Sequence, residues 1–183
     1  MALFTDVPKI VHVQHIHQNV APSLNAFPLK FSGATIEREF SFRDSQFVYQ
    51  TTDPNDQSDW NKLFGLCTGL DARRESAMWA WRVINGSLEF AYYCHDKDGK
   101  AIFPSKPLVS VPVGPGYDYT FEFTIHISSF KSQKPVFFIR EVDGKTQNYA
   151  ISPAVKIPFT KFYRVINAWF GGTSTPTNTI KIY

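Results

Sequence analysis

Cysteine and methionine are scarce in this sequence of 183 residues, which contains two of each. Two thiols, Cys67 and Cys94, cannot form the disulfide framework of a small secreted domain, and a chain of this length buries roughly 70% of its unfolded surface without one. No stretch approaches the ~18 apolar residues of a transmembrane helix, and the first residues lack the basic and apolar segments of a signal peptide. We therefore expect one soluble domain with two reduced cysteines.

Sequence motifs of catalysis are missing as well. There is no Gly-x-Ser-x-Gly motif and no glycine-rich phosphate-binding loop, and neither cysteine lies in a motif that would activate its thiol. We therefore expect a protein that is not an enzyme and needs no cofactor. A glycan-acting hydrolase stays open as an alternative, because its two carboxylates come from distant strands and are recognised by lying about 5–10 Å apart in a cleft.

Basic residues form no dense run, although the net charge is +3. The lysines of the more basic second half are scattered between apolar residues, which is typical of ordinary solubilising charge. We therefore expect neither nucleic acid nor a membrane as partner.

Aromatic residues, in contrast, are abundant: the chain contains 17 Phe, 8 Tyr and 4 Trp. Such side chains suit the pleated, half-buried surface of a sheet better than a helix. Twelve prolines and ten glycines are spread along the chain, which matches many turns and few long helices. The composition therefore predicts an all-β protein.

Apolar and polar residues alternate along much of the sequence, as in strands with one buried face. Residues 119–127 show this most clearly, with apolar residues at every odd position. Asn85-Gly86 and Asp143-Gly144 are strong signals for two-residue turns, and they predict hairpins over 77–94 and 136–151. Further strands are expected at 9–17, 34–42, 47–50, 107–113, 162–170 and 179–183.

One short helical turn is expected near residues 59–64, after the capping residues Ser58 and Asp59 and before Gly65. Together the elements predict a two-sheet antiparallel sandwich of jelly-roll type. Residues 1–30 contain three prolines and few turn signals, and they are interpreted as an N-terminal arm that adds a strand to a neighbouring subunit. Residues 31–183 would then form the sandwich, unless residues 9–17 are a strand of the sandwich itself.

Two polar groups are candidates for metal binding, and for both we favour a role without metal. His15 and His17 would lie on one face of a strand about 7 Å apart, where they could share a zinc ion with a third ligand or simply occupy an exposed edge. The acidic residues of 53–59 could hold calcium, but their spacing differs from that of a calcium loop and their residue types are common in turns. We therefore predict no metal site.

Aromatic residues are the candidates for a ligand site. Trp79 and Trp81 lie on one face of the first hairpin, which is interpreted as core. Tyr93 is out of phase with the apolar residues of its strand and is the better candidate for an exposed ring, and Trp169 is a second one. A row of exposed rings beside a groove would indicate a carbohydrate-binding module.

Several short motifs share their order with a group of uncharacterised proteins that Bacteroides-group bacteria and their phages encode. Those proteins read approximately N-K-L-x-G, S-A-x-x-G-W-R and I-E-x-x-A-Y, and end with F-G-G, a proline and I-x-I. The corresponding residues here are Trp60-Asn61-Lys62-Leu63-Phe64-Gly65, Ser76-Ala77, Trp81-Arg82, Leu88-Glu89-Phe90-Ala91-Tyr92-Tyr93, Gly99, Trp169-Phe170-Gly171-Gly172, Pro176 and Ile180-Lys181-Ile182. The chain thus resembles this group over about a third of its length.

Two departures limit the resemblance: Ala80 replaces the glycine before Trp-Arg, and residues 71–75 replace a loop that often contains histidine and asparagine. Arg82 is expected to pair with a carboxylate or to cap loop carbonyls. The resemblance implies a compact sandwich and a phage-structural setting. We therefore expect a non-catalytic virion component that assembles with protein subunits, located in the virion if phage-encoded and otherwise cytoplasmic. A carbohydrate-binding module is the first alternative.

Overall fold

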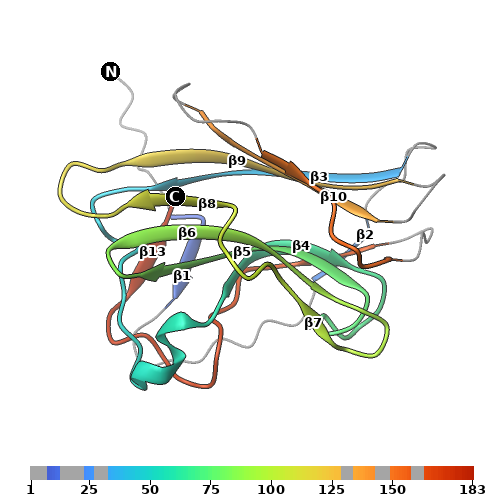
Figure 1. Cartoon of the computed structure of the whole chain (residues 1–183), viewed down its shortest axis with the longest axis horizontal. Coiled ribbons are helices and arrows are strands. Elements are labelled where there is room, and N and C mark those ends of the chain that lie inside the picture. The colour runs from blue at the N-terminus through green and yellow to red at the C-terminus, as the bar shows by residue number, and fades with distance from the viewer. Residues whose placement is uncertain (1–7, 13–22, 27–32, 129–133, 143–148, 158–162) are drawn as a thin grey trace.

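Two antiparallel sheets pack face to face in the computed structural model, which describes residues 8–12, 23–26, 33–128, 134–142, 149–157 and 163–183 (Figure 1). The smaller sheet has the strand order β11 (Tyr149–Ile151), β10 (Pro135–Glu141), β9 (Tyr119–Ser128), β3 (Gly33–Phe42). The larger sheet has the order β2 (Ser23–Ala26), β12 (Arg164–Ile166), β4 (Asn61–Cys67), β5 (Ser76–Ile84), β6 (Ser87–His95), β7 (Ala101–Ile102), and β8 (Val109–Pro112) also pairs with β6. The predicted all-β sandwich is confirmed.

Aromatic side chains fill the space between the two sheets. On β9 the odd positions Phe121, Phe123 and Ile125 are fully buried, as the alternation predicts. Trp79 and Trp81 of β5 are fully buried as well. The Trp79 and Phe123 ring centroids lie 5.3 Å apart in an edge-to-face arrangement, which is a favourable geometry for two aromatic quadrupoles.

The hairpin of β5 and β6 has the predicted turn. Asn85 and Gly86 have φ angles of 51° and 72°, which is the conformation that a two-residue turn of this type requires. The two strands pair over nine residue pairs, from Ser76 with His95 to Ile84 with Ser87. The second predicted hairpin is present as the β10–β11 pair, and its turn lies outside the described residues.

The expected helical turn at residues 59–64 is wrong, because β4 (Asn61–Cys67) occupies this segment. Every residue of β4 is buried, so its apolar residues show no alternation by which a strand could be recognised. The helical piece precedes it as a 3-10 turn, η1 (Pro54–Ser58), with Asp53 as its cap. Within the described ranges, no helix is long and apolar enough to cross a membrane.

The expected strand at residues 47–50 is also wrong, although Phe47 and Tyr49 are buried. This segment bonds through isolated contacts to the end of the chain: the Thr177 amide donates to the Gln50 carbonyl at 2.8 Å and the Lys181 amide to the Gln46 carbonyl at 3.0 Å. An extended segment with irregular bonding buries its rings without forming a ladder.

The N-terminal region contributes two strands to this chain's own sheets. β1 (Ile10–His12) pairs with β13 (Ile180–Ile182), and β2 pairs with β12. The Lys9 ammonium donates to the Glu39 carbonyl at 2.7 Å. Residues 13–17, which include His15 and His17, lie outside the described residues. β1 and β13 form a two-stranded sheet of their own, so residues 10–12 pair within this chain, and the domain boundary at residue 30 stays a prediction.

Replacing Trp81 with Ala should lower the free energy of unfolding by about 3–5 kcal/mol, because the fully buried ring leaves a large cavity. Urea unfolding measures the change. Phe138→Ala is the matched control, since that ring is 44% exposed and should cost less than about 1 kcal/mol. A cost below about 1 kcal/mol for Trp81 would contradict its place in the core.

Deleting residues 1–30 should lower the melting temperature and promote aggregation, because it removes the partner strands of β13 and β12 and exposes their edges. Thermal unfolding with light scattering measures both effects. A truncated protein that unfolds cooperatively at the temperature of the full chain would instead support the interpretation of residues 1–30 as an arm.

Candidate ligand-binding face

The outer face of the larger sheet, turned away from the smaller sheet, carries the polar and aromatic groups of interest. Because successive side chains of a strand point to opposite faces, β5 sends Trp79 inward and Met78 and Ala80 outward. Lys62 of β4 is the cross-strand neighbour of Ala80, and Trp169 forms a bridge with Lys62 from the other side. Sheet pairing therefore places Trp169, Lys62 and two alanines, Ala80 and Ala91, in one row across the outer face.

A second row runs beside the first and ends at Tyr93. Gly65 of β4 pairs with Met78, and Met78 pairs with Tyr93 of β6. A side chain at Gly65 would not fit, since a Cβ there would lie 2.4 Å from both the Ala77 carbonyl oxygen and Met78 Cγ. Small residues in both rows leave room for the long side chains around them.

Lys62 lies at the centre of this face and is almost completely buried, with 7% of its surface exposed. Its ammonium donates to the Trp60 carbonyl at 2.6 Å, and it lies 4.0 Å from the Tyr93 ring centroid and 5.5 Å from that of Trp169. Such contacts are cation–π interactions. Burial lowers the pKa of Lys62 to about 8, partly opposed by the negative charge of Asp59.

Trp60 covers the alanines and is itself fixed by Arg82. The Trp60 ring packs on Ala80 and Ala91, and the Arg82 guanidinium lies 4.2 Å from its centroid. Arg82 also pairs with Glu89 at 2.8 Å and donates to the Ser58 carbonyl at 2.7 Å. Both expected roles of Arg82, the ion pair and the loop contact, are thus confirmed.

Phe103, which follows β7, is the most exposed ring of the site, with 48% of its surface accessible. It stacks on Tyr93 with the rings 5.2 Å apart and inclined by 12°. We refer to Trp60, Lys62, Tyr93, Phe103 and Trp169 as the lysine–aromatic cluster. Its three outer rings, Tyr93, Phe103 and Trp169, are all partly accessible to solvent.

Backbone bonds hold Trp169 in the cluster. The Lys62 amide donates to the Trp169 carbonyl at 2.9 Å, and the Trp169 amide donates back at 3.1 Å. Two residues later the Gly171 amide donates to the Asn61 side-chain oxygen at 2.7 Å. A Cβ on Gly171 would lie 2.4 Å from the Trp60 carbonyl oxygen, so only glycine allows this approach. The ring is therefore positioned by the fold rather than by a free loop.

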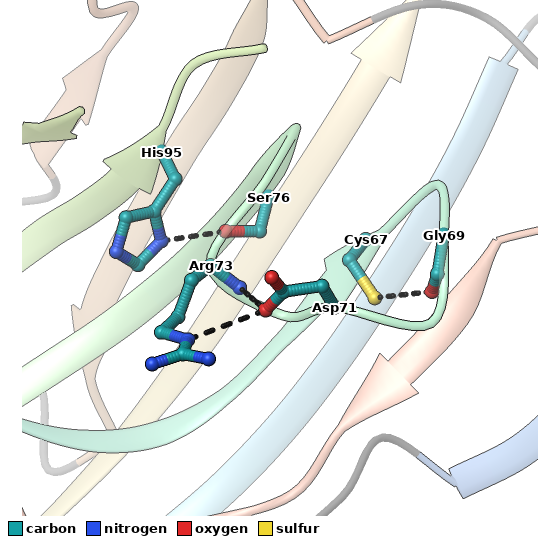
Figure 2. Close-up of polar contacts among 6 residues, drawn as sticks. All are labelled: Cys67, Gly69, Asp71, Arg73, Ser76 and His95. Atoms are coloured by element: carbon teal, nitrogen blue, oxygen red, sulfur yellow. Dashed lines mark hydrogen bonds and ion pairs between the residues drawn. The ribbon is translucent and has the colours of Figure 1, made fainter. Parts of the chain in front are cut away.

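A serine and a histidine also meet at the end of the outer face, as Figure 2 shows. Ser76 Oγ lies 3.0 Å from His95 Nδ1, which are the residue types of a nucleophile and its base. However, Ser76 is fully buried, and burial lowers the pKa of His95 to about 4, far from the value of a base that acts at neutral pH. The pair therefore links β5 to β6 without the properties of a catalytic dyad.

The loop between β4 and β5 is stabilised by its own side chains (Figure 2). The Asp71 carboxylate accepts from the Arg73 amide at 2.9 Å and pairs with its guanidinium at 3.4 Å, and the Cys67 thiol donates to the Gly69 carbonyl at 3.3 Å. The bonds to Arg73 hold the pKa of Asp71 below its ordinary value.

Acidic residues of 53–59 serve the structure as turn and cap residues. Asp53 caps η1 through the Asn55 amide at 2.9 Å. Asp56 accepts from the Thr173 and Ser174 amides at 3.0 and 2.7 Å, and these bonds lower its pKa. In the part of the chain that the structure describes, no three His, Cys, Asp or Glu side chains are placed to hold a metal ion.

Tyr93 and Trp169, the two rings predicted as ligand candidates, thus lie on either side of one lysine. Sequence reasoning missed Lys62, Trp60 and Phe103. Lys62 and Trp60 were assigned to a helical turn, which concealed that Lys62 shares a face with Tyr93. Phe103 follows a strand of two residues, which is too short to show alternation.

Comparisons with protein-family models, curated proteins and solved structures found no match.

The stability of the fold should fall as the pH is lowered from about 6.5 to about 4, and His95 should account for up to about 3 kcal/mol of the loss. In the unfolded chain this imidazole takes up a proton near its ordinary pKa of 6.5, whereas in the folded chain burial lowers its pKa to about 4. Protonation therefore favours the unfolded state throughout this range. Urea unfolding of His95→Gln at several pH values should show a shallower fall, with His126→Gln as control, and an unchanged profile would contradict the assignment.

Proposed function

We propose that this protein is a non-catalytic binding domain that holds a carbohydrate on the outer face of its larger sheet. The observation that carries the proposal is the lysine–aromatic cluster, in which two partly accessible rings, Tyr93 and Trp169, flank one buried lysine and a third, Phe103, stacks on Tyr93. Sugar rings expose C–H groups that pack on aromatic faces, and tyrosine and tryptophan add polar edges to the same contact.

The rigidity of this face supports binding. Lys62 and Tyr93 lie on central strands, and Trp169 is tied to β4 by two backbone hydrogen bonds. A site on strands keeps its geometry when the ligand arrives, so little free energy is lost in ordering side chains. The exposed rings elsewhere in the described structure, such as Tyr117 and Phe138, lack a buried lysine of this kind among their described contacts.

A virion setting is a second proposal, and it rests on the resemblance of short motifs to those of the phage-encoded group, whose residues have packing roles in this fold. Gly65 and Gly171 each approach backbone so closely that a side chain would clash, and Trp81 is fully buried. Residues with such strict packing requirements are those that proteins of one fold have in common. The two proposals are compatible, because a particle component that binds a glycan attaches the particle to whatever carries that glycan.

Glycan binding should depend on the outer rings. We expect a glycan array probed with the full chain to show binding, and Trp169→Ala and Phe103→Ala each to weaken the affinity for a positive glycan by about three- to tenfold. Tyr117→Ala and Phe138→Ala are matched controls, since both remove an exposed ring from another part of the surface and should leave the affinity unchanged. Isothermal titration calorimetry measures the affinities.

Two results would contradict this proposal. One is that no glycan binds, and the other is that the outer-ring variants and the control variants bind equally well. A glycan that is cleaved on incubation, seen as newly formed reducing ends, would favour the hydrolase alternative over a binding domain.

A further inference from the structure

Lys62 has bonding capacity that the described structure does not use. A lysine ammonium has three N–H donors, and among the described residues Lys62 uses one of them, toward the Trp60 carbonyl. Among the described residues, no carboxylate lies within ion-pair distance of Lys62. A cation taken out of water without a negative partner is unfavourable, so a ligand that supplies the missing charge would gain affinity at this position.

Nearby carboxylates are committed elsewhere or poorly suited to balance this charge. Glu89 pairs with Arg82, and Glu75 accepts from the Thr68 hydroxyl at 2.7 Å. Asp59 is the acid whose charge acts on Lys62, but the two groups form no ion pair among the described residues. Burial and the charge of Asp56 raise the pKa of Asp59, and the cations Lys62 and Arg82 oppose this rise only in part. Asp59 therefore balances the charge of Lys62 incompletely.

A second cation on the same face has spare donors as well. Arg164 of β12 is the cross-strand neighbour of Cys67, and it points outward because the next residue, Val165, belongs to the core between the sheets. Its Nη1 atom is buried without a hydrogen-bond partner among the described residues. The outer face thus combines aromatic rings with two cations whose donors are only partly used.

We infer that the ligand is an acidic carbohydrate, and that the carboxylate of a uronic or sialic acid residue binds against Lys62 between Tyr93 and Trp169. The inference rests on the proposed function and specifies its ligand class. A sugar carboxylate accepts from the free donors of Lys62, while the sugar ring packs on the neighbouring aromatic side chains. The pyranose and its charge are therefore recognised by adjacent parts of one cluster.

The decisive experiment compares sugars that differ only in charge. Oligogalacturonate is compared with its methyl ester, and sialyllactose with its sialic acid methyl ester, by titrating each into the full chain in a calorimeter. We expect at least one acidic member to bind about tenfold or more tightly than its neutral counterpart, which is the range of one charge-assisted hydrogen bond. Lys62→Gln should abolish this difference, and Lys156→Gln, which removes an exposed lysine, should preserve it.

The pH dependence gives a separate readout. The titratable groups around Lys62 are Asp59, Tyr93 and His95. Burial lowers the pKa of His95 to about 4 and raises those of Asp59 and Tyr93 above their ordinary values, whereas the pKa of Lys62 is about 8 and lies between pH 7 and 9. A bound carboxylate needs the charged ammonium, so as the pH rises through about 8 the affinity for the acidic sugar should fall to that of its neutral counterpart, about tenfold in all. In Lys62→Gln this fall should be absent, and melting curves verify that the variant is folded.

The outcomes separate this inference from the proposed function. If acidic and neutral members bind equally and Trp169→Ala weakens both, the face binds carbohydrate but the charge inference is wrong. If the acidic preference persists in Lys62→Gln, another group of the protein binds the sugar carboxylate and the inference is again wrong. If neither pair binds and the array is negative, the proposed function fails and the inference fails with it.

Discussion

The register between β5 and β6 is the constraint on which the rest of the structure depends. The two strands pair without interruption over nine residue pairs from a turn of two residues. Because side chains alternate between faces, a slip of one residue would exchange the inward and outward groups of the strand that slips. A slip of β5 would remove Trp79 and Trp81 from the core, and a slip of β6 would bring Tyr93 and His95 into it. The turn at Asn85-Gly86 therefore determines both the packing between the sheets and the composition of the outer face.

The outer face in turn depends on how β4 is covered. A sheet with one solvated face needs only one layer of apolar side chains, but β4 is buried on both sides. On the outer side the segment of residues 169–171 lies against β4, and the Trp60 ring, which Arg82 holds, packs beside it on Ala80 and Ala91. This second layer is what removes Lys62 from water, and so the same packing that stabilises the strand creates the electrostatic properties of the site.

Alternation and turn chemistry were sufficient to predict much of the fold, and the reasons for the failures are physical. Residues 119–127 have one face toward the core and one toward solvent, so their pattern is readable in the sequence. β4 has no such contrast, and an apolar run of its length is compatible with a helix. Residues 47–50 bury their rings in the same way as a strand but bond irregularly. The site was predictable only in part, because Tyr93 and Trp169 stand out along the sequence whereas the lysine between them is defined by pairing.

The two cysteines lie on opposite sides of the larger sheet, and each thiol reacts only when the part of the structure that covers it opens. Cys94 belongs to the core between the sheets and Cys67 to the cluster on the outer side. Burial raises the pKa of Cys67 to about 11 and raises that of Cys94 as well, so little thiolate forms at neutral pH in the closed protein. An alkylating reagent would modify each sulfur chiefly during excursions that separate its own layer. The rate at Cys94 therefore reports separation of the two sheets, and the rate at Cys67 reports release of the outer covering.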